Sequence, residues 1–332
     1  MPVVNPIYER RLTRVVLGEK RVPTASMLRC IRLAAPLFRT SARRGERRAH
    51  AIVLDETAAT LKRLRRRGLN LVVLSEGVEA FGQRLDQAES LKHPGPFLSC
   101  YAEFAAAEKC CVAGPVKLRE RGRVYNAVAI LGPDGRLLGA YRKNFLTRAE
   151  LEQGLTPGDG PVMIETPIGR LGGAICFDLN FTSLLEQYAR LRPDILVFPS
   201  MYHGGLMQAC WAYRCQAHFV SALPFLGGGI LDPLGRSVAQ TDCYSPVAEA
   251  VVNLDRLLVH LDFNQEKFPA IRRRYGDNVQ IVIPANLGCA MLASTVPGRT
   301  AADIVREFGL ERLHDYFADS AAANRRARRA RR

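Results

Sequence analysis

Short continuous apolar runs alternate along this chain with longer segments in which apolar residues recur every three or four positions. LNLVVL at residues 69–74 and DILVFP at residues 194–199 are such runs, and they are typical of strands buried on both faces. Residues 50–67 instead place Leu54 and Leu61 on one side of a predicted helix and the arginines on the other. The pattern therefore predicts an α/β fold in which strands and helices alternate.

The same reading predicts further elements along most of the chain. Strands are predicted at residues 28–38, 110–117, 124–131, 137–141, 162–166, 171–176, 219–223, 229–232 and 248–254. Helices are predicted at residues 96–109, 181–191, 206–217 and 301–317. The turn-forming sequences GPDG (132–135) and DPLG (232–235) indicate two hairpins. Hairpins among buried strands favour a layered α/β sandwich over a purely parallel sheet.

Length and composition limit how this pattern is organised into domains. With 332 residues, 48% of them hydrophobic, the chain can bury one large α/β core. We expect a main domain at residues 27–285, preceded by an N-terminal arm (1–26). An extension (286–320) should make oligomer contacts, and the arginine-rich tail (321–332) should be disordered.

The formal net charge is +15, and six arginines lie within the last nine residues, Asn324–Arg332. Two further basic clusters fall at residues 39–48 and 62–67. Such positive charge could bind nucleic acid or an anionic membrane. No zinc finger, RNA-recognition signature or interleaving of aromatic and basic residues accompanies it, so we favour solvated helix faces and a free tail.

Nine cysteines are present, most of them inside apolar segments, and none forms a CxxC pair or a Cys/His ligand spacing. This usage is typical of free, reduced thiols rather than disulfides or structural zinc. The first twenty residues lack a signal-peptide profile, and no apolar stretch approaches the ~20 residues that span a bilayer. We therefore expect a cytoplasmic protein without membrane contact.

Three reactive side chains stand where predicted strands end: Glu76 after LVVLS, Lys143 after LLGAYR, and Cys176 after LGGAI. A strand end is a rigid position from which to aim a side chain into a pocket. A thiol becomes a nucleophile when a carboxylate can take its proton and a cation can stabilise the charge that develops. Spacing alone does not separate this hypothesis from a buried cysteine and two solvated charges.

A family resemblance supports the catalytic interpretation. In order along the chain, LNLVVLSE, VYNAVAILGPDGRLLGAYRK, TPGDGPVMIETPIGRLGGAICFDLNF, DILVFPSM, WAYRCQA and ILDPLGR resemble segments of the carbon–nitrogen hydrolase (nitrilase) superfamily. The resemblance covers roughly residues 28–278. It implies a four-layer α-β-β-α sandwich, which in this family forms homodimers or larger homo-oligomers. It implies no metal and no organic cofactor.

The resemblance also assigns roles by position. Cys176 would attack the substrate, Glu76 would act as general base, and Lys143 would stabilise the tetrahedral intermediate together with the backbone N–H of Phe177. Many members carry a second glutamate between the lysine and the cysteine. Both Glu150 and Glu152 lie in that window, and the distance to Pro157-Gly158 favours Glu152.

The chain departs from the family pattern beside each of these residues. Ser75 replaces the usual proline before the glutamate, Phe145 replaces the usual histidine after the lysine, and Thr182-Ser183 replaces Pro-Glu after the nucleophile. These departures leave Glu76, Lys143 and Cys176 intact but put the substrate in doubt. We expect the pocket to be lined by four further residues: Phe145, Asn180, Tyr202 and His203.

The resemblance predicts hydrolysis of a non-peptide C–N bond in a small molecule, either an amide or an N-carbamoyl compound, with a nitrile less favoured. Two alternatives remain open. An acyltransferase would use the same acyl-enzyme with a different acceptor. A non-catalytic nucleic-acid-binding protein would use the arginine tail, and its binding would weaken with salt.

Overall fold

A computed structural model describes residues 30–330, so the predicted arm at residues 1–26 lies outside the described residues. The chain divides into two compact units, Ile31–Val252 and the part from Asn253 onward. This boundary corrects the one expected at residue 285. The difference arises because residues 253–285 supply two of the three strands of the second unit's own sheet.

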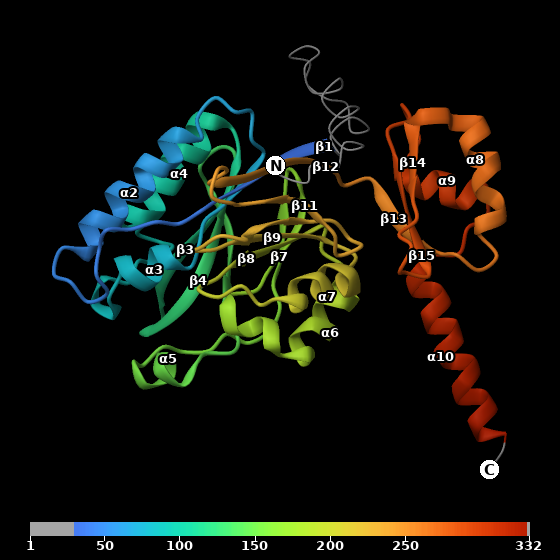
Figure 1. The fold of residues 1–332 in the computed structure, drawn as a ribbon. Helices are drawn as coiled ribbons and strands as arrows, with labels where there is room; N and C mark the ends of the chain where they lie inside the picture. Colours follow the sequence, from blue (N-terminus) through green and yellow to red (C-terminus); the bar gives the residue numbers. More distant parts are fainter. Residues whose placement is uncertain (1–29, 331–332) are drawn as a thin grey trace. The chain divides into compact units, whose positions relative to one another are not determined.

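The first unit contains two six-stranded sheets (Figure 1). One sheet has the order β12-β1-β2-β3-β4-β5, with bounds Val247–Asn253, Cys30–Pro36, Leu71–Val73, Cys111–Glu120, Arg123–Leu131 and Leu137–Arg142. The other has the order β11-β10-β9-β8-β7-β6, with bounds Ser237–Gln240, Gly229–Leu231, His218–Ala222, Ile195–Pro199, Gly169–Gly173 and Met163–Thr166. Almost all of these strands were predicted, whereas β11 was not.

Each sheet combines parallel and antiparallel strands. Strands β1, β2 and β3 are parallel, as are β7, β8 and β9, while β4-β5 and β10-β11 are antiparallel hairpins. Gly135, in the β4-β5 turn, has φ +79°, and a Cβ there would lie 2.7 Å from the carbonyl oxygen of Ala102. This turn therefore requires glycine, as its composition predicted.

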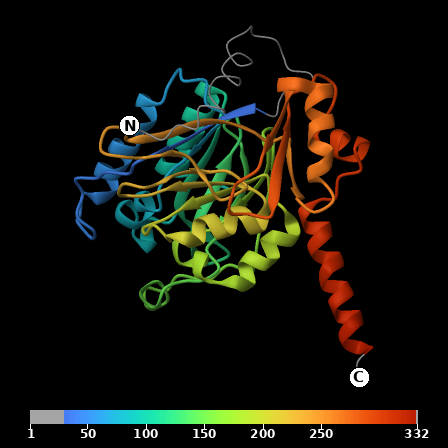
Figure 2. The same cartoon turned by 45° about the vertical axis from the view of Figure 1, so that its right-hand side comes forward.

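Helices cover the outer face of each sheet. The first sheet carries α2 (Ala49–Arg63), α3 (Gly77–Gly82) and α4 (Pro96–Glu108), and the second carries α6 (Thr182–Leu191) and α7 (Leu206–Cys215) (Figures 1 and 2). The other short helices of this unit are α5 (Arg148–Glu152), η1 (Leu85–Gln87) and η2 (Cys176–Asn180). The expected four-layer α-β-β-α sandwich is confirmed.

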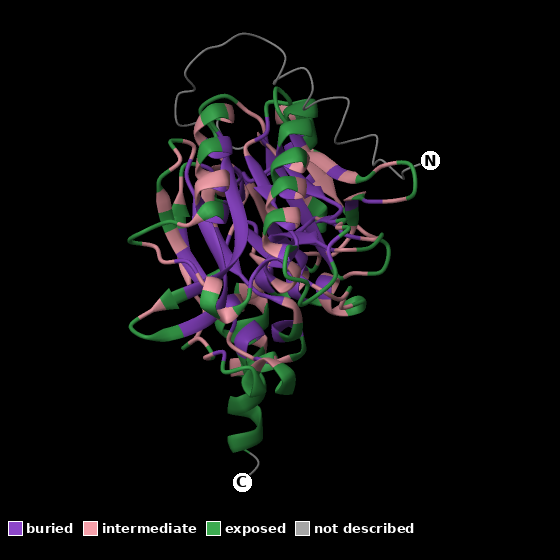
Figure 3. Cartoon of the chain, turned by 90° about the vertical axis from the view of Figure 1, so that its left-hand side faces the viewer, coloured by how far each residue is buried: buried purple, intermediate pink, exposed green. Residues whose placement is uncertain are grey.

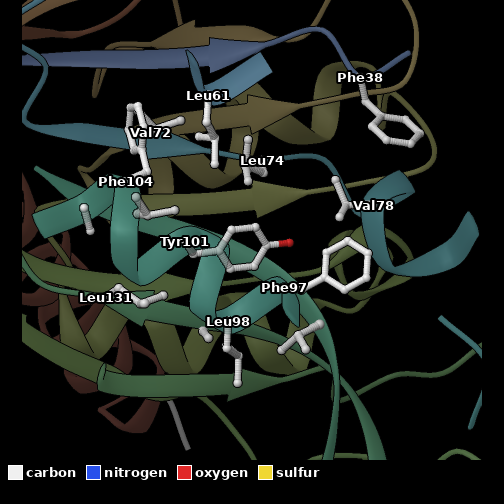
Figure 4. Packing of buried hydrophobic residues seen from close by; sticks show 14 of the residues in the cluster. Phe38, Leu61, Val72, Leu74, Val78, Phe97, Leu98, Tyr101, Phe104 and Leu131 are labelled. Atoms are coloured by element: carbon white, nitrogen blue, oxygen red, sulfur yellow. The ribbon is translucent and has the colours of Figure 1, made fainter. Parts of the chain in front are cut away.

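Apolar packing between α2, α4 and the first sheet forms a large part of the core. Leu61 of α2, Tyr101 and Phe104 of α4 and Val72 of β2 are at most 3% exposed and belong to one cluster (Figure 4). The outward faces of these helices are exposed, while the strands behind them are buried (Figure 3). Burial of apolar surface is favourable by roughly 25 cal/mol per Å². This packing therefore stabilises the sheet whose strand ends are described below.

The second unit has its own core and sheet. Its strands follow the order β13-β15-β14, with bounds Arg256–His260, Cys289–Ser294 and Val279–Val282. Its helices are α8 (Phe268–Tyr275), α9 (Ala301–Glu307), α10 (Leu313–Arg329), η3 (Gln265–Lys267) and η4 (Gly276–Asn278). Phe268, Ile304 and Leu292 meet in a buried apolar cluster. The segment after residue 286 is thus part of a folded unit, with β15 as its central strand.

Two predictions for the C-terminal region are wrong. The helix expected at residues 301–317 is interrupted, because Gly309 takes φ +57° and ends α9 before α10 begins at Leu313. The tail expected to be disordered from residue 321 instead continues α10 to Arg329. Its alanines and arginines have high helix propensity, which explains the continuation.

Candidate active site

The three predicted catalytic residues follow the ends of three strands of the first unit. Glu76 follows β2, Lys143 follows β5, and Cys176 follows β7 after a short connection. The backbone of Lys143 is held on both sides, since its N–H donates to Asn126 O (2.8 Å) and its carbonyl accepts from Gly158 N (2.8 Å). The side chain of Lys143 therefore starts from backbone that hydrogen bonds hold in place.

Glu76 is 3% exposed, and both of its carboxylate oxygens are occupied. Oε1 accepts from Lys143 Nζ (2.9 Å) and Asn126 Nδ2 (2.8 Å), and Oε2 accepts from Met201 N (2.8 Å). Three donors, one of them cationic, offset the cost of burying this charge.

Ser75, which replaces the family's proline, secures the chain just before Glu76. Its hydroxyl donates to Ser200 O (3.1 Å) and accepts from Gly77 N (3.2 Å). Since Ser200 follows β8 of the other sheet, this departure from the family pattern links the two sheets beside the carboxylate.

Lys143 is 1% exposed and pairs with a second glutamate, which is Glu150. Its ammonium donates to Glu150 Oε1 (2.8 Å) and Oε2 (2.9 Å). The preference for Glu152 is therefore wrong: Glu152 is exposed at the last position of α5. The reason is local, because Thr147 caps α5 and binds the carboxylate of Glu150 in a capping box, which turns that side chain inward.

The electrostatics of this cluster are set by burial and by two carboxylates around one ammonium. Burial alone would lower the pKa of Lys143, but Glu76, Cys176 and Glu150 raise it well above its ordinary value. Burial opposes ionisation of Glu150, yet Lys143 and the hydrogen bonds from Thr147 and Asn126 hold the pKa of Glu150 below its usual range. Lys143 is thus a permanent cation and Glu150 a permanent anion at neutral pH.

Cys176 begins the 3-10 turn η2 and takes a left-handed backbone conformation, φ +48°. A non-glycine residue in this region is strained, and such strain is common where a functional side chain must be aimed. Burial, followed by the charge of Glu76, raises the pKa of the Cys176 thiol to about 12, although Lys143 and the Met201 N–H act in the opposite direction. The resting thiol is therefore neutral and would need a base in order to act as a nucleophile.

Two aromatic residues predicted at the site pack against a third. The Phe145 ring stacks on Phe181 with centroids 3.7 Å apart and planes 5° apart, and Phe177 meets Phe181 edge-on at 5.2 Å. Phe145 and Phe177 follow Lys143 and Cys176 closely in the sequence. The rings of Phe145, Phe181 and Phe177 thus join the segment after Lys143 to the segment after Cys176. The side chain of Phe177 is exposed.

The structure places the three remaining predicted lining residues differently. Tyr202 is partly buried, and burial, followed by the charge of Cys176, raises the pKa of its phenol. Asn180 is exposed and donates from Nδ2 to Phe177 O (3.0 Å), so it supports the turn that carries Cys176. His203 is exposed and its ring contacts Gly205 N (3.1 Å) and Gly227 O (3.1 Å), so its contacts are with loops rather than with Glu76, Lys143 or Cys176.

Sequence reasoning missed two residues that contact this cluster and a third that binds the segments beside it. Asn126 donates from Nδ2 to both Glu76 and Glu150, Met201 donates its backbone N–H to Glu76, and Asp178 is a fully buried carboxylate two residues after Cys176. Asn126 carries a usable signal, because it is a lone amide inside the apolar run VYNAVAIL. Met201 carries none, since only its backbone takes part.

Within residues 30–330, no three His, Cys, Asp or Glu side chains are grouped so that they could hold a metal ion. In the same range, no helix combines the length and apolarity needed to cross a bilayer.

Comparison with known proteins adds independent findings. A family model described as "Carbon-nitrogen hydrolase" matches residues 49–252. The omega-amidase NIT2-B of Xenopus laevis is 26% identical over 258 residues, covering 69% of this chain and 91% of that protein. The omega-amidase NIT2 of Homo sapiens is 27% identical over 239 residues, covering 63% of this chain and 84% of that protein.

Solved structures show the same fold. Nit3 of Saccharomyces cerevisiae, a member of branch 10 of the nitrilase superfamily, matches with a TM-score of 0.58 at 20% identity, covering 75% of this chain and 95% of that one. An amidase from Nesterenkonia sp. AN1 matches with a TM-score of 0.57 at 15% identity, covering 77% of this chain and 99% of that one.

Proposed function

Since the chain belongs to the carbon–nitrogen hydrolase family, we propose that it hydrolyses the C–N bond of a small amide through an acyl-enzyme on Cys176. One observation carries the proposal: Glu76 and Lys143 form a buried ion pair (2.9 Å), and both act on the pKa of the Cys176 thiol, although the three residues lie far apart in the sequence. The omega-amidase relatives support an amide as substrate and ammonia as first product.

In the first step, Cys176 Sγ forms a bond to the amide carbon while its proton moves to the Glu76 carboxylate. Because the thiol has a raised pKa, proton transfer must accompany attack rather than precede it. The C=O electron pair moves onto oxygen, and the resulting oxyanion is stabilised by Lys143 and by the backbone N–H of Phe177.

Collapse of this intermediate breaks the C–N bond. Glu76 returns the proton to the leaving nitrogen, ammonia departs, and a thioester remains on Cys176. Glu76 then takes a proton from water as the hydroxyl attacks the thioester. The second intermediate releases the carboxylic acid, and the proton returns to Sγ, which restores the resting thiol.

Glu150 supports these steps without reacting. It holds the Lys143 ammonium by two hydrogen bonds, and it shares the donor Asn126 with Glu76. The paired charge keeps Lys143 in place where a developing oxyanion needs it. Glu150 is therefore a positioning residue in this mechanism.

The experiment that tests the proposal is an ammonia-release screen over primary amides, N-carbamoyl amino acids and nitriles, with wild-type and Cys176→Ala proteins. We expect release from at least one amide and none from the variant. Adding hydroxylamine separates hydrolysis from acyl transfer, since a hydroxamate product reports capture of the thioester. Ammonia release by Cys176→Ala at the wild-type rate would refute the mechanism.

A further inference from the structure

Asp178 lies outside the mechanism above, yet it contacts both of the segments on which that mechanism depends. Its side chain is fully buried in η2. Oδ1 accepts from Asn144 N (3.1 Å) and Phe145 N (2.8 Å), the two residues that follow Lys143. Oδ2 accepts from Ile175 N (2.9 Å), the residue that precedes Cys176, and from the Tyr141 hydroxyl (2.8 Å).

The two carboxylate oxygens of Asp178 thus bind different segments. One binds only the turn after Lys143, and the other binds the backbone beside Cys176 together with Tyr141 of β5. Because β5 and β7 belong to different sheets, no ladder of strand hydrogen bonds joins the two segments directly. Beside the ring contacts of Phe145, Phe181 and Phe177, the carboxylate of Asp178 bridges them by hydrogen bonds.

Neighbouring contacts make this bridge rigid. Asn144 Nδ2 donates to the Tyr141 hydroxyl (2.9 Å) and to the carbonyls of Arg142 (2.9 Å) and Gly160 (3.0 Å). On the other side, the Trp211 indole donates to Leu179 O (3.1 Å) and anchors η2 to α7. A small rotation of Asp178 would break bonds in both segments at once.

We propose that Asp178 is a positioning residue that holds Lys143 and Cys176 at their working separation, an inference that rests on the proposed function of that pair. A shift of about 1 Å between reacting groups can cost up to ~100-fold in rate. Asp178 must be ionised in this role. All four partners donate hydrogen bonds to it, and a protonated carboxyl oxygen would point its own hydrogen at one of these donors.

The charge state of Asp178 agrees with this role. Burial raises the pKa of Asp178 to about 6, while the hydrogen bonds from Ile175, Phe145 and Tyr141 lower it. The side chain is therefore ionised under the alkaline conditions of the experiment below. Burial of this charge has a cost, and the four donors offset it.

The test measures alkylation of Cys176 by iodoacetamide at pH 8, with the modified peptide quantified by mass spectrometry, so it needs no amide substrate. Asp178→Asn keeps the size but turns one acceptor into a donor. We expect alkylation to slow by roughly tenfold, since Lys143 no longer sits where it favours the thiolate. Glu89→Gln is the matched control, because Glu89 is also a buried carboxylate that accepts two backbone N–H groups, from Phe97 and Leu98, away from the cluster.

A double-variant cycle separates positioning from general loosening. With Lys143→Met as the second change, the loss caused by Asp178→Asn should shrink, because the group that Asp178 positions is gone. Glu89→Gln should leave the alkylation rate of each parent protein, wild type or Lys143→Met, nearly unchanged. Equal losses from Asp178→Asn with and without Lys143 would overturn the inference.

A milder pair of variants keeps the test decisive if Asp178→Asn or Lys143→Met fails to fold. Tyr141→Phe removes one bond to Oδ2 with no change in shape and should slow alkylation by about twofold or more. Tyr101→Phe removes an equally buried hydroxyl that donates to Pro115 O (3.0 Å) and should have no effect. Wild-type alkylation in Tyr141→Phe would count against the bridge. Absence of ammonia release in the amide screen, with the alkylation cycle as expected, would refute only the proposed function.

Discussion

The ammonium of Lys143 lies 2.9 Å from Oε1 of Glu76, although 67 residues separate them in the chain. Both side chains are almost fully buried, so neither is held by solvent. Glu150 completes the arrangement by binding the same ammonium. Removing one partner from a buried group of charges leaves another charge buried and uncompensated, which is costly. Substitution of each residue should therefore have a measurable effect.

The nucleophile is the first residue to test. Cys176→Ala should lower ammonia release by several orders of magnitude, because members of a catalytic unit lose nearly all activity singly. Circular dichroism and thermal melting should match the wild type, since Cys176 is only partly buried. Cys210→Ala, at an exposed cysteine on α7, is the control and should retain full activity.

The two candidate second glutamates offer a matched pair. Glu150→Gln places an amide NH₂ beside the Lys143 ammonium and removes its paired charge, so kcat should fall by roughly 100-fold or more. Glu152→Gln, two residues away and exposed, should keep the wild-type kcat. Steady-state kinetics on the best amide of the screen gives both values, and equal effects would contradict the assignment of Glu150.

The charge state of Cys176 can be followed by thiolate absorbance near 240 nm. Since the pKa of this thiol is raised to about 12, its thiolate fraction at pH 8 is on the order of 10⁻⁴. The difference between wild type and Cys176→Ala should therefore show no thiolate step between pH 6 and 10. A step near pH 7 would mean a preformed ion pair with Lys143 and would remove the need for Glu76 as base.

Asn126→Asp tests how much negative charge the cluster tolerates. The new carboxylate would face Glu76 and Glu150 in place of the amide that donates to both, so its own pKa should lie above its value in the unfolded chain. The folded state then binds more protons than the unfolded state, so the loss of stability, about 2 kcal/mol or more at pH 7, should shrink as the pH falls toward 5. Urea unfolding at both pH values measures it, and Asn324→Asp on the exposed end of α10 should change little.

Truncation after Ala323 tests the arginine-rich end. Residues 324–330 are exposed along α10, so their removal, together with Arg331 and Arg332, should leave the melting temperature and amide hydrolysis unchanged. Thermal melting and the ammonia assay check this. A loss of hydrolysis on truncation would instead assign the tail a part in the enzyme's activity.

Much of the first unit could be predicted because its signals are local. The apolar runs at β2 and β8 and the GPDG turn report burial and backbone geometry within a few residues. The unpredicted strand β11 (SVAQ) lacks such a run, with only Val238 buried. The boundary of the second unit was predicted wrongly for a similar reason. Its three strands pair only with one another, and no local pattern in the sequence reports that pairing.

For the site, the sequence by itself predicted which residues carry the chemistry, because Cys176, Glu76 and Lys143 each follow a predicted strand and match the motifs of the family. Tertiary structure alone decided which residues position them. Glu150 rather than Glu152 faces Lys143 because a capping box turns its side chain inward, and Asn126, Met201 and Asp178 matter because hydrogen bonds join distant strand ends. Reactive groups are recognisable by type and local context, whereas a hydrogen bond between remote segments depends on geometry that no local pattern encodes.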